Sequence, residues 1–149
     1  MDANRGVRMT RIKPEKIVYP KLSYQIMAAI FDVHKALGPG FLERIYKRAL
    51  VEELTNRGLK VEEEKMFPVI YNDKNIGTHR LDIVIEDKVV IELKAVDRFS
   101  VHHGAQLKSY LKASGMKLGI LVNFSKNKVE YRRVLRGNTK KLGDATGDR

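Results

Sequence analysis

The chain of 149 residues contains no cysteine, which excludes disulfide bonds and cysteine-bound zinc or iron–sulfur clusters. Long hydrophobic runs are also missing, and no apolar stretch is long enough to cross a membrane. Residues 1–16 are polar and basic, so they do not resemble the hydrophobic segment of a secretory signal. These absences favour a cytoplasmic protein that has no membrane partner.

The sequence patterns of several common enzyme classes are absent as well. There is no P-loop, no dinucleotide-binding glycine pattern, no serine-nucleophile elbow and no metalloprotease histidine spacing. His102 and His103 are adjacent, so on a helix they point in different directions and do not form a two-histidine metal site. The corresponding nucleotide-binding and hydrolase classes are therefore excluded.

What the sequence does have is a hydrophobic content of 43% and a large excess of positive charge. The hydrophobic content and the length suit one globular domain with its own core. Lysine and arginine number 29 against 18 acidic residues, a net charge of +11. Such a surplus favours a polyanion partner, with nucleic acid as the first candidate. A generally basic protein without such a partner is the plainer alternative.

The hydrophobic pattern predicts a single α/β domain over residues 21–135, between a basic N-terminal arm (1–20) and a polar C-terminal tail (136–149). Helices are expected at 22–37, with Ser23 as N-cap, at 42–57 and at 102–114. Strands are expected at 59–71, from about 76 or 78 to 85, at 89–95, at 118–124 and at 128–135. This order predicts a mixed β-sheet flanked by α-helices. The buried stripe of the second helix is expected to comprise Ile45, Ala49, Leu50 and Leu54.

Residues 81–94 form the most informative segment, because two apolar runs flank the polar break 86–88 and so predict a β-hairpin. A three-residue loop, with one residue in the left-handed region, would place Asp82 opposite Glu92. A two-residue loop would put Ile83 there instead, because a slip of one residue moves every side chain to the other face. Leu81 and Ile85 are expected to point with Ile83, away from Asp82.

This register would gather Asp82, Glu92 and Lys94 at one place, since Glu92 and Lys94 share a face of their strand. Two carboxylates offer hard oxygen ligands for Mg²⁺, and a neighbouring lysine can orient a water or stabilise phosphate charge. The alternative is a surface hairpin with ordinary solvated charges. The pattern alone leaves both interpretations open.

Two further polar residues are candidates for a site. Glu43 lies near the start of the second predicted helix, where the helix dipole alone would stabilise a carboxylate. Gln106 lies one turn after His102 and one turn before Tyr110, so it could bind a water, a backbone carbonyl or a phosphate. A solvent-facing amide is the alternative for Gln106.

The spacing Gly40-x-x-Glu43-x-x-Tyr46 looks like the signature that names the GxxExxY proteins. The resemblance covers about residues 22–124, and its other matching segments are Gly38-Pro39-Gly40, Arg80-Leu81-Asp82, Glu92-Leu93-Lys94-Ala95, His103-Gly104-Ala105-Gln106-Leu107 with Tyr110-Leu111, and Leu121-Val122-Asn123-Phe124. That family is similar to the PD-(D/E)XK nuclease superfamily, whose restriction-endonuclease-like core is a mixed sheet with flanking helices. Leu81 stands where the superfamily pattern has proline, a departure that the superfamily tolerates.

The resemblance implies a nuclease that depends on Mg²⁺ or Mn²⁺, but it does not supply the substrate. We favour DNA over RNA, although the sequence does not distinguish the two. The resemblance implies metal-ligand roles for Asp82 and Glu92 and a catalytic role for Lys94. It suggests supporting roles in catalysis for Glu43 and Gln106. We expect the backbone carbonyl of Leu93, together with Glu43, to complete the metal site. Tyr46 is expected to pack rather than to contact substrate.

Three alternatives remain open at this stage. The chain could be a non-catalytic nucleic-acid-binding module that keeps the nuclease fold. It could be a structure-selective, junction-resolving endonuclease that works as a homodimer, so that two strands are cut. It could also belong to a larger assembly that takes its specificity from a partner. The sequence contains no base-reading motif, so it indicates no sequence specificity for a nucleic acid.

Overall fold

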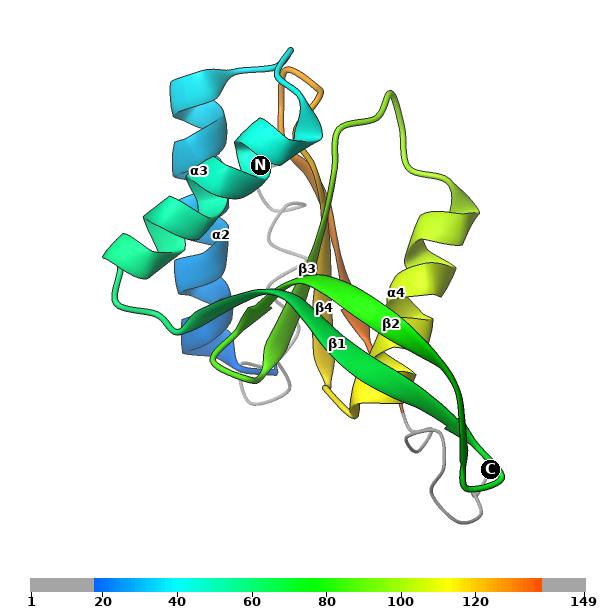
Figure 1. Cartoon of the computed structure of the whole chain (residues 1–149). Coiled ribbons are helices and arrows are strands. Elements are labelled where there is room, and N and C mark those ends of the chain that lie inside the picture. The colour runs from blue at the N-terminus through cyan, green and yellow to red at the C-terminus, as the bar shows by residue number, and fades with distance from the viewer. Residues whose placement is uncertain (1–17, 138–149) are drawn as a thin grey trace, which may run out of the picture.

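The computed structural model describes residues 18–137, so most of the predicted N-terminal arm and C-terminal tail lie outside the described residues. Within this range the chain forms helices and strands in the order α2 (Pro20–Leu37), α3 (Glu43–Asn56), β1 (Val61–Tyr71), β2 (Lys74–Ile85), β3 (Val89–Lys94), α4 (Val101–Ser114), β4 (Leu118–Asn123) and β5 (Glu130–Leu135) (Figure 1). None of the helices described here is long and apolar enough to cross a membrane.

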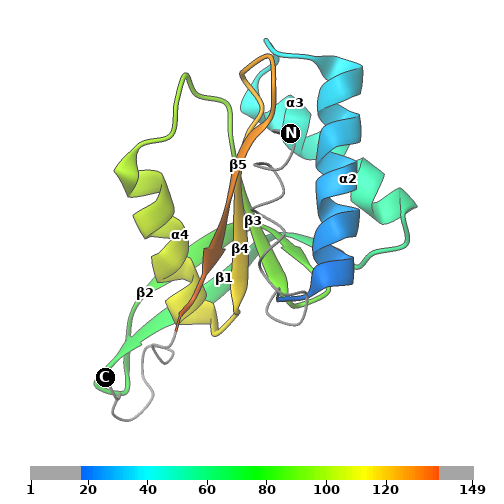
Figure 2. The ribbon, with the colours of Figure 1, turned by 180° about the vertical axis from the view of Figure 1, so that it is seen from behind.

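The strands form one mixed sheet in the order β1-β2-β3-β4-β5. Strands β3 and β4 pair in parallel, and the other three neighbouring pairs are antiparallel. A parallel pair needs a crossover connection, which α4 supplies. Helices α2 and α3 lie on one face of the sheet and α4 on the other, as Figures 1 and 2 show from opposite sides. The predicted α/β fold, a mixed sheet flanked by helices, is confirmed.

Each face of the sheet has its own apolar core, because β3 and β4 are buried on both faces. The core beneath α2 and α3 contains, among others, Ile26, Ile30, Leu50, Leu54, Ile83, Ile85, Ile91 and Ile120. The core beneath α4 contains Leu81, Val84, Val90, Phe99, Leu107, Leu111 and Leu121. Leu81 thus packs on the α4 side, and the prediction that it shares a face with Ile83 and Ile85 is wrong.

Helix α2 begins at Pro20, where the missing backbone N–H is harmless because the first turn has no partner for it. The prediction of Ser23 as N-cap is wrong: Ser23 is buried inside the helix, and its hydroxyl donates to the carbonyl of Val18 at 3.3 Å. Tyr19 takes the cap position in the left-handed region, with φ 49°. Both Val18 and Tyr19 pack against the larger core.

Helix α3 matches its predicted span to within one residue, but its buried face is rotated from the prediction. Tyr46, Leu50 and Leu54 are fully buried at a spacing of four residues. Ile45 is 38% exposed, so its place in the predicted buried stripe is wrong. The aromatic ring of Tyr46, rather than the smaller Ile45, occupies the inner side of the first turn.

Both hairpins contain left-handed turns. Asn72 and Asp73 connect β1 to β2 with φ 48° and 63°, which suits a two-residue hairpin turn. The three-residue loop between β2 and β3 has two left-handed residues, Glu86 and Asp87, where one was predicted. The register of the β1–β2 pair shifts between Val69 and Ile70.

Candidate active site

The register of the β2–β3 hairpin is the predicted one. Ile83 pairs with Ile91, and the same register continued by one residue places Asp82 across from Glu92. The recorded pairing nevertheless ends at Ile83, so β2 leaves β3 at the point where the carboxylates meet. The hairpin therefore brings both carboxylates to the end of β3, as the sequence predicted.

Strand β2 is irregular at Asp82 on both of its edges. The β1–β2 ladder skips the position between Glu64 and Asp82, and Glu64 adopts a left-handed backbone with φ 51°. On the other edge, the backbone N–H of Leu93 donates to Oδ2 of Asp82 at 3.2 Å. The Asp82 side chain thus takes the place of a backbone hydrogen bond to β3. This bond fixes the carboxylate beside the Glu92–Lys94 segment.

Glu92 is a buried carboxylate that is only partly satisfied. The residue is 6% exposed, and its Oε1 atom is buried without a hydrogen-bond partner among the described residues. Its Oε2 atom lies 3.6 Å from Nζ of Lys94. Burial, and then the negative charge of Asp82, raise the pKa of Glu92 to about 7, while the positive charge of Lys94 opposes this rise. A buried carboxylate in this condition destabilises the fold unless a cation accompanies it.

The loop before α3 is closed by Tyr46. Its hydroxyl donates to the carbonyl of Gly38 and accepts from the N–H of Phe41 at 3.2 Å. Its ring stacks on Phe124 with centroids 4.8 Å apart and an interplanar angle of 10°. Tyr46 therefore packs, as predicted, and holds the loop in one conformation. The requirement for glycine in this loop is clearest at Gly40, which has φ 109°.

Glu43 is the first residue of α3 and lies at the rim of the site. Partial burial of its carboxyl group raises its pKa, and the charges of Lys94 and Asp82 act on it in opposite directions. The structure therefore brings Glu43 within electrostatic reach of the hairpin residues. No group of three or more His, Asp or Glu side chains that could share one metal ion occurs within residues 18–137. Direct metal binding by Glu43 stays a prediction.

Helix α4 borders the site from the opposite side. Burial, and then the negative charge of Glu92, raise the pKa of Tyr110. Burial, and then the positive charge of Lys94, lower the pKa of His103. Gln106 is exposed and lies between Tyr110 and His103 on the same face of the helix, by its spacing. This position is compatible with the supporting role predicted for Gln106, and it adds Tyr110 and His103 to the surroundings of the site.

Asn123 was given no role by the sequence analysis, although it secures the chain just after Lys94. Its fully buried side chain accepts from the N–H of Val96 at 3.0 Å and donates to the carbonyl of Val96 at 2.7 Å. It also accepts from the N–H of Ser125 at 3.2 Å. The only signal in the sequence was a polar residue at the end of an apolar strand. Asn123 therefore holds the backbone at Val96, two residues after Lys94.

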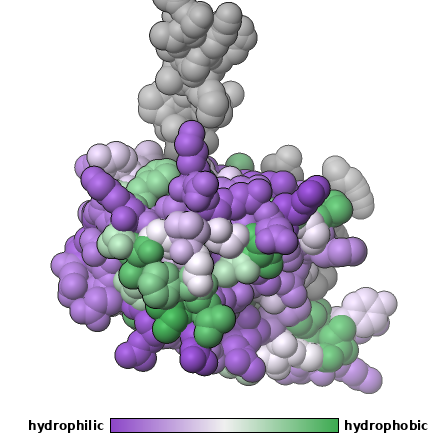
Figure 3. Space-filling model, turned by 90° about the horizontal axis from the view of Figure 1, so that it is seen from above, coloured by the Kyte–Doolittle hydropathy of each residue, from purple (hydrophilic) through white to green (hydrophobic). Residues whose placement is uncertain are grey.

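The rim of the site beside Glu43 is apolar. Phe41, Leu42 and Ile45 are 46%, 62% and 38% exposed around the start of α3. Figure 3 views the molecule from this end, where hydrophobic residues interrupt a mostly hydrophilic surface.

The comparison with protein families supports the assignment that the site suggests. A family model of the PD-(D/E)XK nuclease superfamily matches residues 20–134. The chain belongs to this superfamily. Its resemblance to the GxxExxY proteins in particular stays an interpretation of the motif, and a comparison with curated proteins finds no match.

A solved structure agrees with the fold of this PD-(D/E)XK protein. The crystal structure of SSO0001 is similar to it with a TM-score of 0.52 and 23% sequence identity. The alignment covers 62% of this chain and 48% of the other, so the chain spans about half the length of that protein. At this identity the likeness concerns the fold alone.

Divalent cations are the general cofactors of PD-(D/E)XK nucleases, and the residues at the end of β3 fit such an ion. Asp82 and Glu92 supply carboxylate oxygens, the donors that Mg²⁺ and Mn²⁺ prefer. The buried Oε1 of Glu92 needs a partner, which a cation would provide.

Proposed function

We propose that this protein is a Mg²⁺- or Mn²⁺-dependent nuclease that hydrolyses phosphodiester bonds in DNA. The observation that carries the proposal is the unpartnered, buried Oε1 of Glu92 next to Asp82 and Lys94. A protein that used the fold only for binding would gain nothing from burying a carboxylate in this way. Membership of the nuclease superfamily supports the same conclusion.

In the proposed mechanism, Asp82, Glu92 and the backbone carbonyl of Leu93 hold the cation. When bound, the cation polarises the scissile phosphate and lowers the pKa of the attacking water. The Lys94 ammonium, next to Glu92, orients that water and offsets the charge that builds up on the phosphate oxygens. These roles assign ligation to Asp82 of β2 and to Glu92 and Leu93 of β3, and charge stabilisation to Lys94 of β3.

Glu43 and Gln106 have supporting roles in the proposal. Glu43, on the opposite side from α4, orients water at the edge of the site. Gln106 donates a hydrogen bond to a substrate phosphate or helps to position Lys94. Both side chains are exposed, so each can contact substrate without crossing the core.

The net charge of +11 supports nucleic acid as the substrate. We propose DNA rather than RNA as the substrate, and a comparison of substrates tests this choice directly. Labelled single strands, duplexes, flaps and four-way junctions, as DNA and as RNA, are incubated with Mg²⁺, Mn²⁺ or EDTA. The proposal predicts cutting of at least one DNA substrate that EDTA abolishes. Cutting that continues in EDTA, or metal-dependent cutting of RNA only, would contradict it.

Metal binding separates the nuclease from a non-catalytic binding module. Calorimetric titration with Mn²⁺ should show a site in the wild type that is lost in Glu92→Gln and kept in Glu63→Gln, an exposed glutamate on β1. Equal Mn²⁺ binding by all three proteins would favour the binding module. The dimeric, junction-resolving version also stays a prediction, and an active monomer in sedimentation experiments would contradict it.

A further inference from the structure

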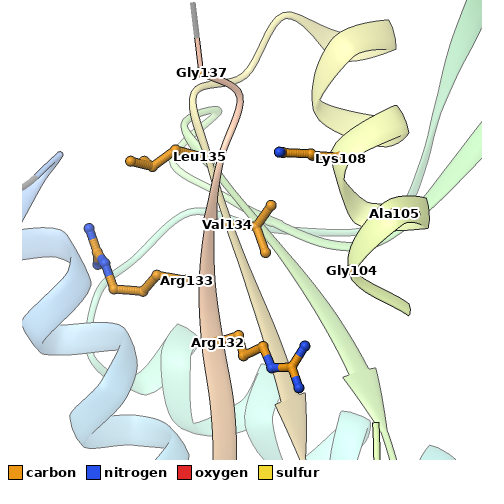
Figure 4. Close-up of a pocket in the computed structure, with 8 residues that line it drawn as sticks. All are labelled: Gly104, Ala105, Lys108, Arg132, Arg133, Val134, Leu135 and Gly137. Atoms are coloured by element: carbon orange, nitrogen blue, oxygen red, sulfur yellow. The ribbon is translucent and has the colours of Figure 1, made fainter. Parts of the chain in front are cut away.

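A groove of about 680 Å³ runs between α4 and the edge strand β5, outside the carboxylate site. Its α4 wall includes the small residues Gly104 and Ala105, and Val134 of β5 points toward α4 between the two elements (Figure 4). A Cβ atom added at Gly104 would meet no atom within 4 Å, so this wall is open. The groove can therefore admit an extended chain close to the α4 backbone.

The groove is positively charged and has no acidic lining. The eight described lining residues include three cations and no carboxylate. Figure 4 shows Lys108 extending from α4 toward β5 and Arg132 extending from β5 on the α4 side, with Val134 between them, whereas Arg133 points toward α2. Arg133 is engaged there, because it donates to Oγ of Ser23 at 2.8 Å. Lys108 and Arg132 are thus the two cations that face the groove, and both are exposed.

A chain of contacts leads from this groove to the carboxylate site. The guanidinium of Arg132 lies over the ring of Phe99, 5.2 Å from its centroid. The ring of Phe99 in turn meets the ring of His103 edge-on at 6.1 Å. Burial, and then the positive charge of Lys94, lower the pKa of His103, so His103 lies within electrostatic reach of Lys94. A strand that occupied the groove would therefore continue toward the reacting centre.

We propose that the groove between α4 and β5 binds the phosphodiester backbone of a nucleic acid strand next to the bond that is cut. This inference rests on the proposed nuclease function for the position of the cut bond, but not for the binding itself. Lys108 and Arg132, at separate points along the groove, neutralise different phosphates of the strand, and such contacts position a strand without reading its sequence. The absence of a base-reading motif agrees with this kind of binding.

The first test changes the charge of the groove in the full-length chain. Binding of a fluorescent DNA duplex is measured in EDTA at several salt concentrations, so no cleavage can occur. Lys108→Glu/Arg132→Glu is compared with Lys21→Glu/Lys74→Glu, which changes the net charge equally at exposed positions on α2 and at the β1–β2 turn. The groove variant should bind at least about 10-fold more weakly, with a salt dependence of log Kd smaller by about two units.

The second test blocks the groove without changing charge. Gly104→Leu places a bulky side chain in open space on a helix, where leucine is well tolerated. It should weaken duplex binding several-fold, whereas Gly104→Ala, which leaves most of the groove open, should not. Circular dichroism and thermal unfolding confirm that both variants are folded. Unchanged binding by folded Gly104→Leu would overturn the proposal.

Two other outcomes would also overturn it. Equal loss of binding in the groove variant and in the charge-matched control would mean that net charge alone attracts DNA. Poly-glutamate that competes as well as DNA for the groove would indicate an acidic protein segment as its occupant. Normal cleavage by Lys94→Ala would instead contradict the proposed nuclease mechanism and leave the binding result in EDTA intact. The two failures are therefore distinguishable.

Discussion

Glu92 is the residue at which the stability of the fold and the proposed function conflict. A carboxylate with 6% exposure, an unpartnered oxygen and a second carboxylate nearby destabilises the metal-free protein. Lys94 offsets only part of this cost, since its pKa-lowering effect on Glu92 is smaller than the effects of burial and Asp82. Residues that are costly to the fold in this way are typical of binding sites for ions and of catalytic sites.

The burial of the Glu92 carboxyl group predicts how the stability of the folded protein depends on pH. The pKa of Glu92 is raised from 4.5 to about 7 in the folded state, so the folded protein binds more protons than the unfolded one between these values. In EDTA, the stability due to Glu92 should fall by on the order of 2 kcal/mol as pH rises from 5 to 8. Chemical denaturation of wild type and Glu92→Gln checks this, because the variant should lack that loss. Parallel pH profiles for the two proteins would show that Glu92 is not buried as described.

Asn123 is expected to matter for both stability and activity. Its side chain is fully buried and makes hydrogen bonds to the backbone of Val96 and Ser125. Asn123→Ala should lower the free energy of unfolding by about 2–4 kcal/mol, because buried backbone groups lose their partners. It should also slow cleavage at saturating substrate, since the segment after Lys94 is released. Asn127→Ala, a change at an exposed position of the loop that follows β4, is the control and should affect neither denaturation nor rate.

At the scale of elements, the loop between α2 and α3 gives the glycine–glutamate–tyrosine spacing a physical explanation. Gly40 supplies a backbone conformation that other residues avoid, Tyr46 anchors the loop from inside the core, and Glu43 starts the helix between them. Together, Gly40 and Tyr46 fix the conformation of the loop, and this conformation places the Glu43 carboxylate near the end of β3. The spacing of the three residues reflects this geometry rather than three separate functions.

Two glycine-to-alanine substitutions test this explanation. Gly40→Ala forces alanine to φ 109° and should cost about 2 kcal/mol of stability, together with part of the cleavage activity. Gly104→Ala lies in the helical part of α4 with open space around it, so it should raise stability by up to about 1 kcal/mol. Thermal unfolding of both variants measures the contrast. Equal effects of the two changes would contradict the role given to Gly40.

Much of the arrangement of elements could be predicted because hydrophobic periodicity and turn residues are local signals. The register of the β2–β3 hairpin is the one expected from a three-residue loop at 86–88, and not that of the alternative two-residue loop. The shift of Leu81 to the α4 core could not be foreseen, because it depends on the irregularity shared by β1 and β2 at Glu64 and Asp82. The role of Asn123 was equally hidden, since its partners become neighbours only when β4 pairs with β3.

At the scale of the whole molecule, the sheet separates two apolar cores, and the helices α3 and α4 that cover them both border the candidate site at the end of β3. The α3 start carries Glu43 from one face, and α4 carries Gln106 from the other. The carboxylates lie at the end of β3, a strand buried by both layers. The central strand thus holds the groups that we propose to react, and the groove that we propose for substrate lies beside β5.

The most direct test of the account compares cleavage by Lys94→Ala with cleavage by the wild type on a DNA substrate, in Mg²⁺ and under single-turnover conditions. Lys74→Ala, the same change at an exposed position of β2, is the control. The account predicts that Lys94→Ala loses at least about 100-fold in rate while it keeps its fold and most of its DNA binding. Lys74→Ala should cut like the wild type. Metal-dependent cutting by Lys94→Ala at the wild-type rate would contradict the proposed active site.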